Sequence, residues 1–510
     1  STGYQARKLS WANRDNFGGP RWDYRGNGSY VMRMYDARGN VAQEDQGQVT
    51  SFGTNGGERF ADAAATAWWN SLLMPTGKVQ QAGIAHQNTY DARGRLAYNK
   101  SSDPFINKGA GPTGLNSDTA YVIRTYQYNG NDQLIEETVL FEGPSSGRVV
   151  RRYEYNRRGQ RTLVRDTVYA SGVTAESAGQ MVYVYDSVTA RLTSVEGLVG
   201  ATRYGKVRYV YDRAGRDTLR AVAPTTGSFE VITRTSYDSL SQIASISTAN
   251  STGTVHYSMT GPSYNLVGDL TGYTSSGDGV NSGTHTYTYT TDGTRRLLDA
   301  VDGGVSHVWT YDLLGNRMTE WNRTNIGDQN QCSSTFTNVY DSDNRLQRRT
   351  PATPSTACKK TRYFTDQSGN RLGEADTTYN NPPGVPPLGG LGSVTSYTAG
   401  GQLYFSLTLT ADLLAKDYNW HWYDVQGRRV VSQVATGNVN TPIFPHPDSV
   451  GGYRTYFVYD GSDVALELVR SGSAWSVDRR FLSGGLDRPL LGRFNVGGTY
   501  KNTTLVADRG

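Results

Sequence analysis

One phrase recurs along the chain, and residues 207–222, VRYVYDRAGRDTLRAV, carry a clear copy of it. Apolar or aromatic residues alternate with other residues up to Tyr211, which is the period of a β-strand. Asp212 to Gly215 form a short polar segment before a second strand-like run. The phrase therefore predicts a β-hairpin with its turn at these four residues.

The turn residues have a mechanical reason to be present. The carboxylate of Asp212 can accept hydrogen bonds from nearby backbone amides. Gly215 can adopt the positive φ that closes short hairpin loops. We therefore expect these residue types to shape the turn and to take no part in chemistry.

Fourteen copies of the phrase are recognisable. They begin at Tyr35, Tyr90, Tyr128, Tyr155, Tyr185, Tyr211, Tyr237, Tyr264, Tyr289, Tyr311, Tyr340, Tyr363, Tyr423 and Tyr459. From Tyr128 to Tyr363 the step is about 22 to 30 residues, which is one hairpin and its return connection. A single hairpin is marginal in water, so successive hairpins must lie edge to edge. This predicts one continuous antiparallel ribbon over residues 1–510.

The best copies define the repeat-signature positions. These are Tyr35, Asp36, Gly39, Tyr90, Asp91, Gly94, Tyr155, Gly159, Tyr211, Asp212, Gly215, Tyr311, Asp312, Gly315, Tyr423, Asp424 and Gly427. We expect the tyrosines to occupy equivalent strand positions on one face, because side chains alternate between faces with period two. Their rings would then stack as a ladder that joins each hairpin to the next.

Three segments depart from this rhythm. Residues 58–74 place apolar side chains at helical spacing, which predicts one short inserted helix. Residues 381–403 contain NPPGVPPLGGLGS and predict a long loop or plug without regular structure. A third interruption, rich in Pro and Gly, covers residues 437–452.

Composition fits an all-β protein and narrows its partners. The chain has 35 Tyr, 59 Gly and a mean hydropathy of -0.57, which favours strands and turns. The net charge of +5 is small for 510 residues and no basic run occurs, so no nucleic-acid partner is expected. No segment reaches the roughly 18 apolar residues of a membrane span. Cys332 and Cys358 bracket one hairpin, and we expect a disulfide between them.

Residues suited to catalysis or metal binding are scattered. The six histidines show no HExxH pattern and no close ligand pairs. Gly143 to Gly147 fit G-x-S-x-G, but the segment leads into a strand, whereas a nucleophile elbow leads into a helix. Asp341 and Asp343 lack the rest of a calcium loop and suit a turn better. We expect no catalytic residue, metal or cofactor.

The repeated Y-D-x-x-G-[NR]-[LRV] phrase resembles the RHS-repeat, or YD-repeat, family, which includes bacterial RHS shell proteins, the cocoons of insecticidal toxin complexes and teneurin-like modules. Residues 479–494, RRFLSGGLDRPLLGRF, resemble its core signature. Phe481, Leu482, Gly484, Asp487, Pro489 and Leu490 carry the match. The resemblance implies an all-β fold in which the long hairpin ribbon coils into a shell or spiral.

The resemblance also implies a function. We expect a non-enzymatic shell or scaffold, secreted or exposed on a bacterial surface, whose partner is its own C-terminal effector segment or a neighbouring subunit. Such an effector would lie beyond Gly510, because no Asp-Pro-x-Gly cleavage motif occurs in the chain. The alternative is an extracellular adhesive or fibre protein whose aromatic residues bind glycans.

Overall fold

The structure is a computed structural model. It describes residues 10–14, 20–25, 29–48, 84–102, 120–141, 147–173, 177–224, 229–277, 282–302, 305–323, 334–354, 360–365, 370–376, 391–397, 402–409, 415–424, 426–438, 452–471, 474–483, 489–496 and 499–504. Within these ranges every regular element is a strand, so the all-β prediction is confirmed. The helix predicted at 58–74 lies outside the described residues.

The strands follow one another along the chain. Their bounds are β1 Ser10–Arg14, β2 Pro20–Arg25, β3 Ser29–Tyr35, β4 Val41–Gln48, β5 Ile84–Tyr90, β6 Leu96–Ser102, β7 Ala120–Tyr128, β8 Leu134–Phe141, β9 Gly147–Tyr155, β10 Arg161–Ala170, β11 Ala178–Tyr185, β12 Leu192–Val199, β13 Thr202–Tyr211, β14 Asp217–Ala223, β15 Val231–Tyr237, β16 Ile243–Ala249, β17 Val255–Tyr264, β18 Leu270–Gly277, β19 Gly283–Tyr289, β20 Leu297–Asp302, β21 Val305–Tyr311, β22 Arg317–Arg323, β23 Ser334–Tyr340, β24 Leu346–Pro351, β25 Thr361–Thr365, β26 Arg371–Asp376, β27 Leu391–Tyr397, β28 Leu403–Leu409, β29 Ala415–Tyr423, β30 Arg429–Asn438, β31 Tyr453–Asp460, β32 Asp463–Ser471, β33 Ala474–Ser483, β34 Pro489–Val496 and β35 Thr499–Thr504.

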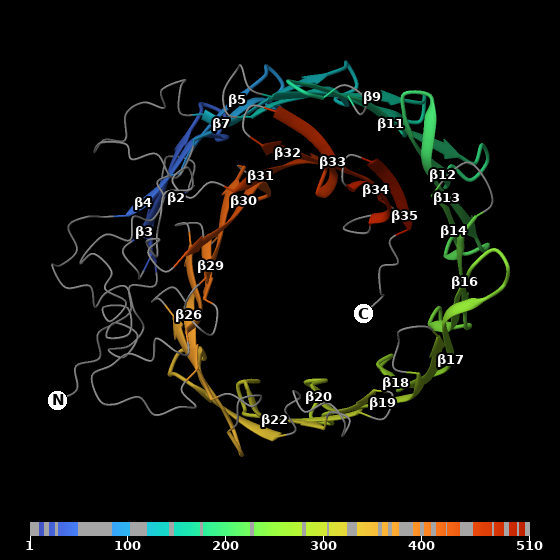
Figure 1. Cartoon of the computed structure of the whole chain (residues 1–510), viewed down its shortest axis with the longest axis vertical. Helices are drawn as coiled ribbons and strands as arrows, with labels where there is room; N and C mark the ends of the chain where they lie inside the picture. The colour runs from blue at the N-terminus through green and yellow to red at the C-terminus, as the bar shows by residue number, and fades with distance from the viewer. Residues whose placement is uncertain are drawn as a thin grey trace. The chain divides into compact units, whose positions relative to one another are not determined.

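Consecutive strands pair antiparallel, as a hairpin ribbon requires (Figure 1). In β13 and β14, Val210 pairs with Leu219 but Tyr211 pairs with Asp217, so the register shifts at the phrase tyrosine. The same shift precedes Tyr237 and Tyr423 in their hairpins. A bulge at this place bends the strand and increases its twist.

The chain divides into two compact units that interleave in sequence. Unit 1 contains residues 1–154, 165–178 and 362–478. Unit 2 contains residues 155–164, 179–361 and 479–510. Unit 1 therefore combines hairpins from the two ends of the chain.

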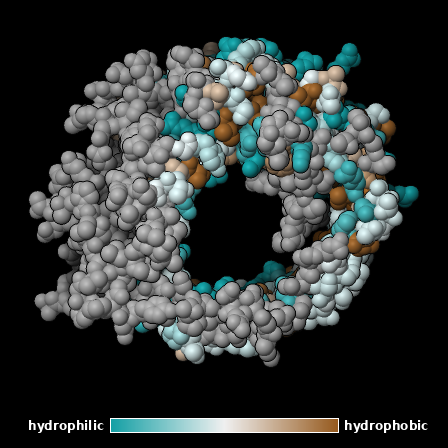
Figure 2. Space-filling model, in the orientation of Figure 1, coloured by the Kyte–Doolittle hydropathy of each residue, from teal (hydrophilic) through white to brown (hydrophobic). Residues whose placement is uncertain are grey.

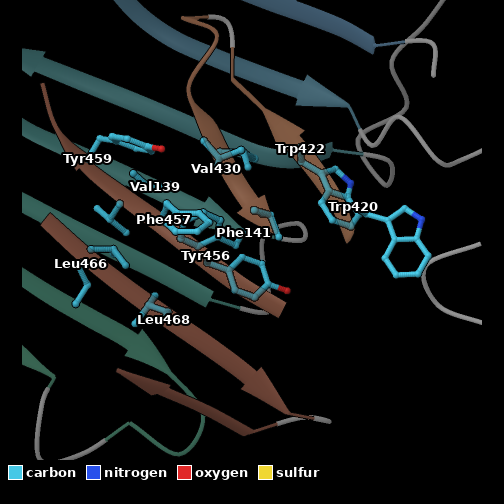
Figure 3. Close-up of a cluster of buried hydrophobic side chains, with 14 of the residues drawn as sticks. Val139, Phe141, Trp420, Trp422, Val430, Tyr456, Phe457, Tyr459, Leu466 and Leu468 are labelled. Carbon is cyan, nitrogen blue, oxygen red and sulfur yellow. The ribbon is translucent and has the colours of Figure 1, made fainter. Parts of the chain in front are cut away.

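Unit 1 has a core between these two sets of hairpins. Figure 3 shows Phe141 of β8 among Tyr456 and Phe457 of β31 and Leu468 of β32. The ring centroids of Phe141 and Tyr456 are 5.1 Å apart. Gly147 lies so close to Trp475 that a Cβ there would be 3.0 Å from the indole ring. Burial of these aromatic groups is the main force that holds the two sets together.

Unit 2 contains the most regular part of the ribbon, from β11 to β24. Its buried apolar side chains include Val207, Ala221 and Met259. Large apolar side chains stand exposed at several of its turns, including Leu240 and Leu266. On the face that Figure 2 shows, hydrophobic and hydrophilic residues of the described chain are mixed in small groups.

The segment at 381–403 differs from the prediction. Residues 381–390 lie outside the described ranges, but 391–397 form β27 and pair with β28. The prediction of a loop was wrong there because LGSVTSY ends in an unrecognised copy of the phrase, at Tyr397. Of the interruption at 437–452, residues 437 and 438 end β30, Gly452 is described, and the remaining residues lie outside the description.

Candidate functional site at the hairpin junctions

Eleven of the fourteen phrase tyrosines bond to the preceding hairpin from a position at or next to the end of their strand. The Tyr211 hydroxyl donates a hydrogen bond to the carbonyl of Leu192, the first residue of β12, over 2.9 Å. Ten other tyrosines make the equivalent bond: Tyr90, Tyr128, Tyr185, Tyr237, Tyr264, Tyr289, Tyr311, Tyr340, Tyr423 and Tyr459, with distances between 2.6 and 3.1 Å. The tyrosine therefore links one hairpin to the next.

Arginine covers several of these rings. The guanidinium of Arg216, from the preceding turn, lies 4.6 Å from the ring centroid of Tyr237. Arg95 over Tyr128 and Arg428 over Tyr459 repeat the arrangement at 4.5 and 4.9 Å. Arginine binds the faces of aromatic rings through its planar charge. The expected ring ladder is thus replaced at these junctions by a hydroxyl bond and a stacked arginine.

The turn aspartate organises the loop as the sequence suggests. Oδ1 of Asp212 accepts a hydrogen bond from the Arg216 backbone N–H over 2.9 Å, and Oδ2 accepts one from the Arg216 side chain over 2.7 Å. The backbone bond and then the side-chain bond lower the pKa of Asp212 from its ordinary value. Asn156 holds its own turn through the same Oδ1 contacts, to Arg158 and Gln160.

The signature glycines need a left-handed backbone. Gly39, Gly94, Gly159, Gly215, Gly315 and Gly427 have φ between 77° and 91°. Phrases without this glycine keep the conformation, with Asp132, Ser241 and Asn344 at φ of 63°, 67° and 61°. The loop geometry therefore persists where the sequence pattern fails, at a cost in backbone strain.

Sequence patterns did not reveal a buried ion network in unit 1. Arg124 of β7 is fully buried, and its guanidinium lies 3.3 Å from Glu137 and 3.3 Å from Asp424. Burial opposes the charge of Arg124, but Asp424 and then Glu137 outweigh it and raise the pKa. Asp424 also accepts a hydrogen bond from Arg428 within its own turn, over 2.9 Å. A repeat-signature carboxylate thus bridges hairpins about 300 residues apart.

A second buried arginine makes a similar bridge. Arg151 of β9 donates a hydrogen bond to the carbonyl of Tyr459 and lies 3.9 Å from the carboxylate of Asp460. Both partners belong to the phrase copy at Tyr459. The spacing of the phrase carries no signal for either bridge, because Asp424, Tyr459 and Asp460 come from the other end of the chain.

The remaining predicted residues are only partly placed. Phe481 and Leu482 lie near the end of β33, with Leu482 fully buried and the ring of Phe481 edge-on to that of Phe494, at a centroid distance of 6.1 Å. Pro489 and Leu490 begin β34. Gly484, Asp487, Cys332, Cys358 and the segment 142–146 lie outside the described residues, so the disulfide stays a prediction.

The described residues offer no group of three side chains suited to a metal ion. Asp341 and Asp343 both pair with Arg345, at 2.7 and 2.5 Å, as turn carboxylates do. In the described ranges there is also no helix long and apolar enough to cross a membrane.

Comparisons with known proteins give structural similarity at low identity. No protein-family model matches the chain, and no curated protein matches it. The crystal structure of TcdB2-TccC3-TEV is similar over 93% of this chain, with 13% identity and a TM-score of 0.34. The Tc holotoxin pore of Photorhabdus luminescens is similar over 93%, with 13% identity and a TM-score of 0.31. A porin-like protein from Bacteroides uniformis covers 48% of the chain, with 15% identity and a TM-score of 0.19.

The chain spans about a quarter of the Tc chains that it resembles, 24% and 23% of their lengths. It spans 91% of the porin-like protein.

Proposed function

We propose that this protein is a shell or scaffold of the RHS type, whose wall is the hairpin ribbon. The observation that carries this proposal is the tyrosine-to-carbonyl bond, which recurs at eleven junctions from Tyr90 to Tyr459. Each bond uses the repeat residues to join neighbouring hairpins. A chain whose repeated residues join each hairpin to the next is suited to building an extended surface.

The proposed partner is an effector segment that comes after this chain in a longer protein, or a neighbouring subunit. We propose that the protein works outside the bacterial cytoplasm, secreted or at the cell surface. The resemblance of the sequence to RHS repeats supports this role, because shells of that family enclose a C-terminal segment.

The junction geometry argues against the glycan-binding alternative for the phrase tyrosines. A ring that stacks on a sugar needs an open face, whereas Tyr237 has the guanidinium of Arg216 against its face. Its hydroxyl is also occupied, by the Asp217 carbonyl at 3.1 Å. The junctions between hairpins account for these rings without a bound sugar.

The proposal can be tested by fusing a small, protease-sensitive reporter after Gly510. If the ribbon encloses a segment fused to its C-terminal end, the fused reporter is cleaved at least ten times more slowly than the same reporter free in solution. Equal cleavage rates would contradict the enclosing role. Binding of the fusion to immobilised glycans, with an unprotected reporter, would favour the adhesive alternative.

A matched variant distinguishes protection of the reporter by the closed ribbon from protection by mere attachment to a large chain. Changing Tyr211 and Tyr237 to Phe removes two junction hydroxyls, and we expect the reporter to become more sensitive to protease. The control is Tyr453→Phe, because Tyr453 is exposed and begins its strand. This control should leave the cleavage rate unchanged.

A further inference from the structure

Three side chains on adjacent strands of unit 2 form a chain of polar contacts outside the repeat phrases. Ser275 lies on β18, His285 on β19 and Asp302 at the end of β20. Nε2 of His285 lies 2.6 Å from Oγ of Ser275. Nδ1 of His285 lies against Oδ1 of Asp302, without the alignment of a hydrogen bond.

The sheet register brings these residues together. Tyr273 pairs with His285 and Ser275 pairs with Gly283, so Ser275 and His285 are diagonal neighbours on one face. Gly283 has no side chain to separate them. The ring of His285 is held flat against Tyr273, with centroids 4.3 Å apart and an interplanar angle of 11°.

We propose that Ser275 is an activated nucleophile, with His285 as its general base and Asp302 as the positioning residue. A carboxylate at Nδ1 favours the tautomer that has its proton there, which leaves Nε2 free to accept the serine proton. The order of the three groups is the one that serine nucleophiles require. None of these residues takes part in the tyrosine junctions, so this proposal is independent of the proposed shell function.

Two other serine–histidine pairs lack this order. Ser101 contacts Nδ1 of His86 at 2.9 Å, and Ser432 contacts Nδ1 of His421 at 3.2 Å. In these pairs serine occupies the nitrogen that a positioning carboxylate would need. Ser432 is therefore a matched control within the same chain.

The burial of the site restricts its substrate. Ser275 is 4% exposed and His285 is 3% exposed, while the side chain of Asp302 is 46% exposed. The proposed substrate class is therefore a small carboxylic ester. In the first step Oγ would bond to the acyl carbon while the serine proton passes to Nε2, and the ester's alkoxide would take that proton and leave as the alcohol. In the second step water would attack the acyl carbon and give a proton to Nε2. The bond from Oγ to the acyl carbon would then break, releasing the acid, and that proton would return to Oγ.

The test treats the full chain with diisopropyl fluorophosphate and measures its mass. In the expected reaction an oxygen–phosphorus bond forms at Oγ, fluoride leaves and the serine proton passes through Nε2 to water. We expect one adduct, which peptide mapping places at Ser275. We also expect a stoichiometric burst of nitrophenolate from 4-nitrophenyl acetate.

Variants separate activation from a structural role. Ser275→Ala should remove the adduct, His285→Gln should slow its formation at least 100-fold, and Asp302→Asn at least 10-fold, with partial recovery in Asp302→Glu. Ser432→Ala should change nothing. An adduct elsewhere, a rate equal to that of the denatured chain, or full labelling in His285→Gln would overturn the proposal. Mapping the wild-type adduct settles the site even if a variant fails to fold.

Discussion

At the scale of the residue, the phrase tyrosine joins hairpins through its hydroxyl. Sequence alone indicates that equivalent tyrosines end equivalent strands, and the structure places them there. The acceptor could not be predicted, because it is a backbone carbonyl of the preceding repeat and a residue of any type supplies it. The stacking of arginine on these rings could not be predicted either, because the arginine and the ring belong to neighbouring repeats.

Tyr211→Phe tests this junction. The ring keeps its place beside Arg191, 5.8 Å from the guanidinium carbon, but the bond to the Leu192 carbonyl is lost. A net loss of about 1 kcal/mol in local stability is expected for one hydrogen bond. Hydrogen exchange of the β12 and β13 amides should become faster. The exposed Tyr453, changed to Phe, should leave exchange in its hairpin unaltered.

The turn carboxylates make the hairpins sensitive to acid. Bonds from the turn lower the pKa of Asp36, Asp91, Asp212 and Asp312. Bonds from Thr294 lower the pKa of Asp292 to about 2. Because the folded pKa lies below the unfolded value, the stabilisation is present above the unfolded value of about 4 and is lost as pH falls towards 2.

We therefore expect the melting temperature to fall as the pH is lowered through this range. Asp212→Asn should keep its turn and lose the local acid response, because Asn156 holds an equivalent turn with a neutral amide. Asp212→Ala should open the turn at every pH. Hydrogen exchange at Arg216 measured between pH 5 and 2.5 distinguishes the three proteins, and an identical acid response in Asp212→Asn would contradict this account.

At the scale of the element, the hairpin turn has one geometry that several sequences satisfy. Sequence reasoning identifies the turns that contain glycine. It cannot locate the left-handed residue where glycine is absent, because Ala190 and Ser241 carry no such preference and the register of the two strands imposes the conformation. The hairpin at Tyr397 is hidden for a different reason, because Thr398 replaces the aspartate of the phrase and a Pro- and Gly-rich run precedes the strand. The carbonyl of Leu403 nevertheless accepts the hydroxyl bond of Tyr423.

Ala190→Gly should stabilise its turn. Ala190 has φ of 59°, and relief of about 1 to 2 kcal/mol of left-handed strain exceeds the cost of about 0.5 to 1 kcal/mol for the freer unfolded chain. The reverse change, Gly215→Ala, should destabilise its own turn, because Gly215 has φ of 89°, a conformation in which a Cβ is strained. Urea unfolding followed by exchange at residues 186–191 measures the first effect, and a lower stability there would refute it.

At the scale of the whole molecule, the early and late hairpins of the sequence form one unit. The repeat pattern predicts neighbours along the ribbon and is silent on contacts between distant hairpins. The apolar residues of β29 and β31 give a hint, since Trp420, Trp422 and Tyr456 are too many for a surface strand, but nothing in their spacing identifies β8 as their partner.

Arg124→Ala should destabilise unit 1 strongly. The change leaves Asp424 and Glu137 buried without their shared cation, and breaking a buried pair in this way costs about 3 to 5 kcal/mol. The matched control is Arg165→Ala, whose ion pair with Glu154 at 2.8 Å is 56% exposed on both sides. That control should cost at most about 1 kcal/mol. Limited proteolysis within residues 120–154 reports the difference, and equal losses in the two variants would contradict the role of burial.

A fragment of residues 1–361 should expose the face that the late hairpins cover. Phe141 and Val149, both fully buried in the whole chain, would lose the aromatic side chains of β31 and β33. We expect the fragment to bind the dye ANS, and the added fragment 362–510 to reverse the binding. Dye binding equal to that of the whole chain would show that unit 1 does not need its late hairpins.

The tyrosine junctions also decide how the ribbon would respond to a pulling force. In unit 2 each junction bond joins a strand end to the hairpin before it, so tension applied along the chain loads one hairpin at a time. Each hairpin that peels away would release about 26 residues, or on the order of 90 Å of extended chain. The ribbon would lengthen in steps of nearly equal size, and a local rupture would end at the next intact tyrosine.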